Sequence, residues 1–196
     1  MAQMKMSAIV FIRHAETDMA GRFCGRADPE MNMTGERQLA GVVEAIAPLG
    51  IQRILSSDLR RASRTAAAIA QHIGVNVELQ PGFREIHFGL WEGLSWQEIE
   101  HQFPQEAGRW LRSFPWQNAP EGEAYTAFTA RIDAAIAPLL CETVGLTTAV
   151  VTHRGVMCYA LRTFFGFPEA EAWTTTAPYG AVVTAAIRPC DCEVLP

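Results

Sequence analysis

The amino-acid sequence predicts an α/β protein, a three-layer α/β/α sandwich around a mainly parallel central sheet. Short runs of apolar, often β-branched residues alternate along the chain with stretches in which apolar residues recur at helical spacing. A chain of 196 residues is long enough to bury one full core. We therefore expect a single domain over residues 1–196.

The apolar runs predict five strands, and the stretches between them predict helices. The expected strands cover residues 7–12, 51–55, 75–79, 147–152 and 182–187. The expected helices run from Thr34 to about Pro48, from Leu59 to Ile73, from Tyr125 to Leu139 and from Val156 to Phe165. We expect Thr34 to cap the first helix and Ser56-Ser57-Asp58 to cap the second, which ends at Gly74.

Residues 80–123 break this alternation and predict a lid-like excursion that covers one end of the sheet. Ser95 and Glu98 have the spacing of a capping box, which predicts a short helix there. The segment is rich in charged residues and also holds four of the five tryptophans, Trp91, Trp96, Trp110 and Trp116. We interpret it as an excursion of the single domain and not as a second domain.

Composition argues against several classes of partner. A net charge of -5 without a basic stripe argues against nucleic-acid binding, so an anionic substrate needs a local basic pocket. No apolar run has the length of a membrane span or a signal peptide, which predicts a cytoplasmic protein with no membrane partner. A homodimer is compatible with the class, because dimers are common among soluble enzymes.

The five cysteines predict neither a zinc site nor a disulfide framework, because they are scattered, odd in number and form no CxxC pair. Cys190 and Cys192 stand one residue apart near the C-terminus, and we expect plain thiols there. No acidic cluster has the spacing of a metal site. We therefore expect no metal and no cofactor.

Two of the expected strands end in a histidine that adjoins an arginine. The first strand leads into Arg13-His14, and the strand at 147–152 leads into His153-Arg154-Gly155. Open α/β sheets bind ligands at the carboxyl ends of their strands. Imidazole beside guanidinium at this edge predicts an anion site. For His14 alone, the alternative is a strand-end histidine that only caps a backbone group.

These residue types suit phosphoryl transfer. A neutral imidazole at His14 is a competent nucleophile toward phosphorus, and Arg13 would favour the neutral form while donating to phosphate oxygens. The helix after the second strand begins with three arginines, of which only one or two can line a single pocket. These are Arg60, Arg61 and Arg64, and the alternative for them is a solvated basic face.

A carboxylate for general acid–base work is expected near residues 83–93. Glu85 is the leading candidate and Glu92 its competitor, and either is alternatively a structural salt-bridge partner. His153 can donate a hydrogen bond to a transferred phosphoryl group, and Gly155 allows the backbone to approach a ligand closely.

Together these motifs resemble the histidine phosphatase superfamily, also called phosphoglycerate-mutase-like. The family's Arg-His-Gly-x-Thr signature stands here as Arg13-His14-Ala15-Glu16-Thr17. Its Ser-Ser-x-Leu-x-Arg-Ala-x-x-Thr-Ala motif stands at residues 56–66 with Arg61 in the phosphate-binding place. Its acid position falls on Glu85, and its late His-Gly motif falls on His153 and Arg154, with Gly155 next. The matches follow the family's order over nearly the whole chain.

The resemblance implies a two-step phosphoryl transfer without a metal. His14 would attack phosphorus and form a phosphohistidine, while Glu85 would protonate the leaving group and then activate water. The phosphate-binding residues that the family pattern implies are Arg13, Thr17, Arg22, Arg61 and His153. Two positions depart from the pattern: Ala15 replaces a glycine, and Ala20 stands where the family often has Asn. The connection before Arg22 is short, which puts the placement of Arg22 in question.

The segments around Trp91, Trp116 and Arg22 are similar to the α-ribazole phosphatases of cobalamin assembly. The resemblance implies a small phosphorylated metabolite as substrate, α-ribazole 5′-phosphate, whose aromatic base could stack on the tryptophans. Their alternative role is to anchor the lid. The rival functions are a broad-specificity sugar-phosphate phosphatase, a phosphoglycerate mutase and, from a different class, a non-catalytic module that binds phosphate or a partner. A mutase is disfavoured because Arg109 and Arg112 are the only arginine or lysine residues between Glu92 and Glu123.

Overall fold

One five-stranded sheet forms the centre of the molecule, in the order β3-β2-β4-β1-β5. The computed structural model describes residues 7–142 and 145–187. The strands are β1 (Ala8–Arg13), β2 (Arg53–Ser56), β3 (Val77–Leu79), β4 (Thr147–Thr152) and β5 (Val182–Ala186). β5 is antiparallel to β1, and the other pairs are parallel. The predicted, mainly parallel sheet is therefore confirmed.

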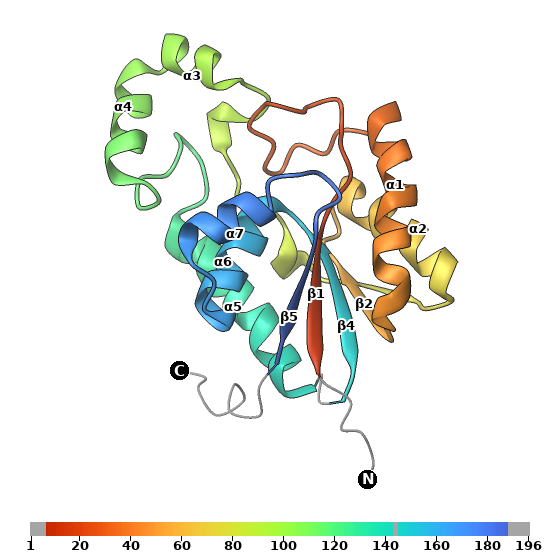
Figure 1. Ribbon diagram of the computed structural model, residues 1–196. Helices are drawn as coiled ribbons and strands as arrows, with labels where there is room; N and C mark the ends of the chain where they lie inside the picture. Colours follow the sequence, from red (N-terminus) through yellow and green to blue (C-terminus); the bar gives the residue numbers. More distant parts are fainter. Residues whose placement is uncertain (1–6, 143–144, 188–196) are drawn as a thin grey trace.

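Helices cover both faces of this sheet, which makes the three layers visible in Figure 1. On one face lie α1 (Met33–Ile46) and α2 (Arg60–Ile73). The other face carries α5 (Tyr125–Glu142), α6 (Arg154–Phe165) and α7 (Glu169–Thr175). The three-layer prediction is confirmed, but the sequence analysis did not predict α7.

The central strand β1 supplies both cores because its side chains alternate between the two faces. Val10 and Ile12 pack with the residues of α1 and α2, whereas Ile9 and Phe11 pack with those of α5 and α6. All four side chains are fully buried. An unbroken apolar run is what a strand covered on both faces requires.

Residues 80–123 form a lobe beyond the carboxyl ends of the strands, and we call them the lid segment (Figure 1). Its elements are the short 3-10 turns η2 (Pro81–Phe83) and η3 (Gly89–Trp91) and the helices α3 (Trp96–Gln102) and α4 (Pro104–Ser113). The expected capping box is present: Ser95 and Glu98 exchange side-chain to backbone hydrogen bonds at the start of α3.

The lid segment has a small core of its own. Trp91 and Ile99 are fully buried there, and Ala107 and Ala119 complete the cluster. Phe23, from the loop after β1, packs on it. The lobe is therefore held by apolar packing that is separate from both cores of the sheet.

Three local expectations are wrong. The N-cap of α1 is Asn32, whose side chain accepts from Gly35 N, so the helix begins one residue before Thr34. α2 follows its N-cap Leu59 and has no side-chain cap: Ser57 contacts His153, and Ser56 donates to the backbone oxygen of Ser57. Cys141, at the end of α5, is disulfide-bonded, against the expectation of no disulfide. Sequence spacing alone does not reveal which cysteines a fold brings together. Cys190 and Cys192 lie outside the described residues.

No helix among the described residues is both long and apolar enough to cross a membrane.

Candidate active site

The pairing of β1 with β4 brings the two strand-end histidines together. Arg13 is in register with Thr152, and the backbone N–H of His14 donates to the oxygen of Thr152 at 2.9 Å. The ring centroids of His14 and His153 are 5.1 Å apart. Two residues separated by most of the chain thus face one another at the carboxyl edge of the sheet.

His14 is buried and holds its proton on one defined nitrogen. Its Nδ1 lies 2.7 Å from the backbone oxygen of Ala15, which can only accept a hydrogen bond, so Nδ1 carries the hydrogen. The lone pair is then on Nε2. Burial, followed by the positive charge of Arg61, holds the pKa of His14 well below its ordinary value of 6.5. At neutral pH the ring is therefore uncharged, with Nε2 available as a nucleophile.

His153 is engaged differently. Its Nε2 lies 2.9 Å from the hydroxyl of Ser57, and its Nδ1 is buried without a hydrogen-bond partner. Burial, the charge of Arg61 and the proximity of His14 lower the pKa of His153 well below 6.5. Ser57, which the sequence analysis had assigned to a helix cap, instead orients this second imidazole.

Arg61 is the one member of the arginine trio that is buried. It donates to the backbone oxygens of Cys24, Gly25 and Ala27, at 3.2, 2.7 and 2.6 Å. Its buried Nε has no partner. The alternative of a solvated basic face describes the other two: Arg60 pairs with Asp28 and Glu30, and Arg64 pairs with Glu30 and Glu36.

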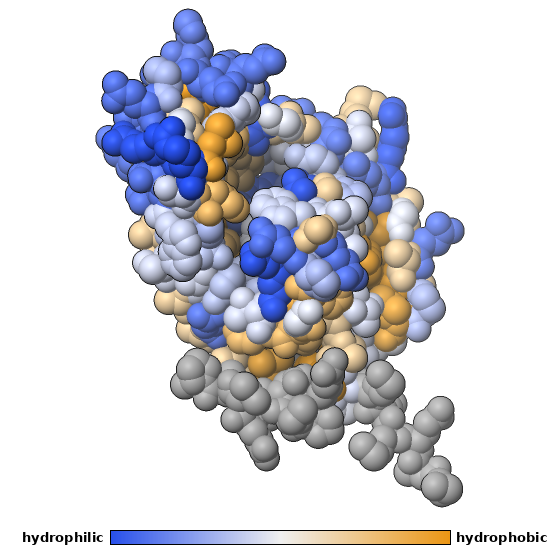
Figure 2. All heavy atoms as spheres, turned by 60° about the vertical axis from the view of Figure 1, so that its left-hand side comes forward, coloured by the Kyte–Doolittle hydropathy of each residue, from blue (hydrophilic) through white to orange (hydrophobic). Residues whose placement is uncertain are grey.

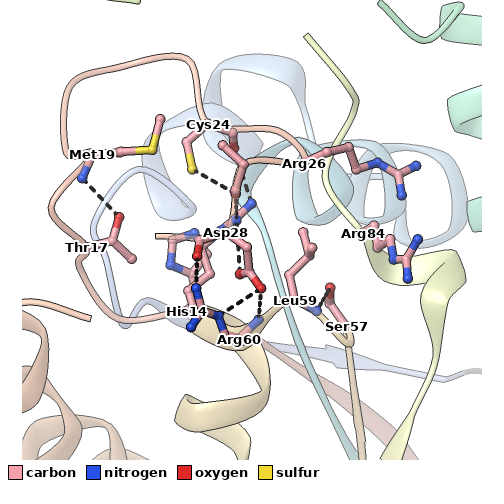
Figure 3. Close-up of polar contacts among 12 residues, drawn as sticks. His14, Thr17, Met19, Cys24, Arg26, Asp28, Ser57, Leu59, Arg60 and Arg84 are labelled. Atoms are coloured by element: carbon pink, nitrogen blue, oxygen red, sulfur yellow. Dashed lines mark hydrogen bonds and ion pairs between the residues drawn. The ribbon is translucent and has the colours of Figure 1, made fainter. Parts of the chain in front are cut away.

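The loop of residues 24–28 is fixed between that arginine and a carboxylate. Glu92 accepts hydrogen bonds from the backbone N–H groups of Gly25, Arg26 and Ala27, at 2.8–3.0 Å, and from that of Phe88 at 2.9 Å. In Figure 3 Asp28 of this loop reaches toward Arg60. Glu92 therefore holds the loop, and it does not line the cavity.

Glu85 lines the cavity together with His14, and only 8% of its surface is exposed. Its oxygens accept from the backbone N–H of Ile86 at 3.0 Å and of Gly155 at 2.9 Å. A Cβ at position 155 would lie 2.4 Å from Glu85 Oε1, so only glycine lets α6 approach the carboxylate this closely. Backbone groups contact the oxygens of both glutamates, and the two differ in that Glu85 lines the cavity beside His14 whereas Glu92 does not line it.

Arg13 and Thr17 lie in the same cavity. The guanidinium carbon of Arg13 stands 3.9 Å from the centroid of the Tyr179 ring, and Arg13 also donates to the backbone oxygen of Ala177. The hydroxyl of Thr17, itself buried, accepts from Met19 N at 3.4 Å, as Figure 3 shows.

Arg22 lies at the edge of the cavity and is bound to the lid segment. Its Nη1 donates at 2.7 Å both to the backbone oxygen of Gly93 and to Glu98. A phosphate contact by Arg22 would require these bonds to open, so the structure does not bring Arg22 to the histidines. The substitution at Ala15 costs nothing, because among the described non-glycine residues only Glu121 has a positive φ.

The cavity has a volume of about 370 Å³, and beyond the histidines its walls are aromatic. In Figure 2 the face that carries it is hollowed beneath the lobe of the lid segment. The aromatic lining residues come from six separate stretches of chain: Phe23, Phe88, Trp110, Phe114, Tyr125, Phe128, Tyr159, Trp173 and Tyr179. Sequence analysis missed Trp173 and Tyr179, since neither adjoins a motif.

The tryptophans of the lid segment divide between the two roles considered for them. Trp91 lies in the core of the lobe with Trp96 packed beside it, so both anchor the lid. Trp110 packs on Trp91 and also lines the cavity. Trp116 is 71% exposed.

A sequence model of the histidine phosphatase superfamily (branch 1) matches residues 9–195. The chain belongs to this family. It is a phosphatase with the phosphoglycerate-mutase-like fold. Of the residues that the sequence analysis assigned to the site, the cavity is lined by Arg13, His14, Thr17, Arg22 and Glu85, whereas Arg61 and His153 are buried outside its lining.

Its relatives within the superfamily carry different activities in their names. The chain is 28% identical over 166 residues to the adenosylcobalamin/alpha-ribazole phosphatase of Salmonella typhimurium, covering 83% of this chain and 81% of that protein. It is 31% identical over 169 residues to a "Probable phosphoglycerate mutase GpmB" of Cronobacter sakazakii, covering 83% and 77%. A solved mycobacterial glucosyl-3-phosphoglycerate phosphatase superimposes with a TM-score of 0.77 at 25% identity, covering 91% and 89%.

Proposed function

We propose that the chain hydrolyses phosphate monoesters through a phosphohistidine at His14 Nε2. The observation that carries this proposal is the hydrogen bond from His14 Nδ1 to the oxygen of Ala15 at 2.7 Å. This bond fixes the ring and leaves the lone pair on Nε2, so attack on phosphorus requires no prior proton transfer. The lowered pKa of His14, caused by burial and then by Arg61, keeps that lone pair free at neutral pH.

In the first step His14 Nε2 forms a bond to phosphorus as the bond to the leaving oxygen breaks. Glu85, as the general acid, gives its carboxyl proton to that oxygen. Arg13, Arg61 and His153 bind the equatorial oxygens and stabilise their charge. Arg61 Nε and His153 Nδ1 are buried and have no hydrogen-bond partner, as expected of groups that bind a phosphate oxygen.

In the second step water attacks the phosphohistidine and the N–P bond breaks. Glu85, now a carboxylate, takes a proton from that water, and inorganic phosphate and neutral His14 are released. Because guanidinium groups supply the charge neutralisation, we expect hydrolysis to persist in excess EDTA. Loss of activity on chelation, restored by a divalent cation, would contradict this mechanism.

The substrate that we propose is a phosphate ester with a bulky aromatic leaving group, α-ribazole 5′-phosphate. The aromatic walls of the cavity suit such a ring. The Salmonella relative bears this activity in its name. A small phosphorylated metabolite of this kind fits a cytoplasmic location, where such esters are made.

A mutase would need a second basic site within the lid segment. Arg109 lies there in an exposed pair with Glu106, and neither Arg109 nor Arg112 lines the cavity. This arrangement favours transfer to water. The sugar-phosphate phosphatases remain the rival for the leaving group, as the mycobacterial neighbour illustrates.

Steady-state kinetics on a panel of esters tests the substrate proposal. The panel contains α-ribazole 5′-phosphate, 3-phosphoglycerate, glucosyl-3-phosphoglycerate and common hexose phosphates, with the His14→Ala variant as control. We expect the highest kcat/KM for α-ribazole 5′-phosphate and phosphate release, not isomerisation, from 3-phosphoglycerate. A higher kcat/KM for a sugar phosphate, or phosphoglycerate isomerisation, would overturn it.

A further inference from the structure

Four arginines line the catalytic cavity, and they differ in whether a carboxylate neutralises them. Arg22 pairs with Glu98 at 2.7 Å, and Arg162 pairs with Glu169 at 3.0 Å. Within residues 7–142 and 145–187, no carboxylate stands within ion-pair distance of Arg13 or Arg154. Arg13 adjoins the nucleophile and has its role in phosphate binding. Arg154 is an unneutralised cation that the mechanism does not use.

Arg154 is held in place by an aromatic neighbour. It is the first residue of α6, its guanidinium carbon lies 4.4 Å from the centroid of the Trp173 ring, and its Nη2 donates to the backbone oxygen of Trp173 at 3.0 Å. Stacking and one hydrogen bond fix the plane of the guanidinium in advance. Its Nε is buried and has no hydrogen-bond partner.

The position of Arg154 places it on the leaving-group side of the site. The next residue, Gly155, donates its N–H to Glu85 Oε2 at 2.9 Å, so Arg154 adjoins the proposed acid. The pKa of Arg13 is lowered chiefly by burial, and the positive charge of Arg154 lowers it further. An anion between the two guanidiniums would relieve that repulsion.

Arg154 stands between His153 and Gly155, at the end of β4 and the start of α6. Its fixed plane, buried Nε donor and missing carboxylate are what a binding site for a planar anion requires.

We propose that Arg154 is a specificity-determining residue, which binds a second anionic group carried by the leaving group of the substrate. This inference rests on the proposed function, because the leaving group must lie at Glu85. It predicts that, among esters with leaving groups of the same size, those whose leaving group bears a carboxylate or a further phosphate have the lower KM.

Paired substrates that differ only in leaving-group charge test the proposal. Phenyl phosphate and p-nitrophenyl phosphate have neutral leaving groups; 3- and 4-carboxyphenyl phosphate carry a carboxylate, and 1,4-phenylene bisphosphate carries a phosphate. We expect the wild type to show a lower KM for at least one anionic member. In Arg154→Met the KM for that member should rise about tenfold relative to phenyl phosphate, with kcat little changed. The member that responds identifies carboxylate or phosphate as the preferred anion.

Arg154→Lys and Arg109→Met serve as the companion variants. Arg109 is an exposed arginine of the lid segment outside the cavity, so its loss controls for the change in net charge. Lysine keeps the charge at position 154 but not the planar fork, so we expect an intermediate KM and a readable result if the methionine variant does not fold. A KM that rises equally for neutral and anionic substrates, or for none, overturns the proposal. Failure of the proposed function itself would appear separately, as hydrolysis of phenyl phosphate that survives His14→Ala.

Discussion

The two buried histidines at the edge of the sheet do different work because different ring nitrogens are engaged. His14 uses Nδ1 to hold a backbone oxygen and keeps Nε2 free, whereas His153 uses Nε2 to contact Ser57. Both lie among the same arginines, and both have pKa values lowered chiefly by burial. The ring nitrogen that is engaged therefore distinguishes the proposed nucleophile from the proposed phosphate-binding imidazole, where charge alone would not.

The lowered pKa of His14 predicts how stability responds to acid. The folded chain holds this ring neutral well below 6.5, while the unfolded chain takes up a proton near 6.5, so the unfolded state binds more protons in between. Stability that is present above the unfolded pKa is then lost as the pH falls toward the folded one. Between pH 6.5 and 5.5 we expect this histidine to cost about 1 kcal/mol.

Urea unfolding of the wild type and of His14→Gln at the two pH values measures that contribution. The glutamine variant lacks the titrating group, so its loss of stability over this range should be smaller by about 1 kcal/mol. Equal losses in the two proteins would show that His14 is protonated in the folded state.

We expect substitutions of Glu85 and Glu92 to have different effects, a loss of activity for Glu85 and a loss of stability for Glu92. Glu85→Gln removes the proton donor, and we expect kcat to fall by about 100-fold or more while inorganic phosphate still binds as a competitive inhibitor. Glu92→Gln leaves that group in place but weakens four backbone hydrogen bonds of the 24–28 loop and its neighbour, so we expect a lower free energy of unfolding. A silent Glu85→Gln together with an inactive but stable Glu92→Gln would reassign the acid.

At the scale of elements, the lid segment is stabilised by its own core of apolar residues. Ile99 lies fully buried in that cluster, and Ile69 lies fully buried in the core beneath α1 and α2. We expect Ile99→Ala to lower the free energy of unfolding by about 3 kcal/mol, mainly by destabilising the lobe. Amide hydrogen exchange in α3 and α4 should accelerate while β1 and β4 stay protected.

Ile69→Ala is the matched control, because the same truncation then falls under the sheet. Its effect should reach the amides of β1 and β4 and leave α3 and α4 closer to their original rates. If Ile99→Ala accelerates exchange equally in the sheet and the lobe, the two do not open independently.

Motifs that are local in sequence could be predicted, and contacts between distant segments could not. The capping box of α3 depends on residues three apart in the sequence, so the spacing of Ser95 and Glu98 predicts it. The duties of Glu92, Ser57 and Trp173 depend on segments that only the fold brings together. For this reason the sequence analysis assigned Ser57 wrongly to a helix cap. It also left the role of Glu92 open between a catalytic acid and a structural partner.

At the scale of the whole molecule, the parallel pairing of β1 with β4 decides where the chemistry lies. The apolar character of both strands and the polar residues after them predicted an anion site at one edge of the sheet, and the register of Arg13 with Thr152 places the two histidines there. The aromatic walls of the cavity come from the loop after β1, the lid segment, the helices α5 to α7 and the loop between α7 and β5. No periodicity or motif reveals that assembly, because its members are scattered along the chain.

The central claim is that the phosphoryl group passes through His14, and trapping the intermediate tests it most directly. The wild type and His14→Ala are mixed with p-nitrophenyl phosphate, quenched in alkali within one turnover, digested and analysed by mass spectrometry. We predict an acid-labile phosphoryl group on the wild-type peptide that contains residue 14, and neither phosphorylation nor turnover in the variant. A phosphoryl group on a different residue, or undiminished turnover in His14→Ala, would contradict the account.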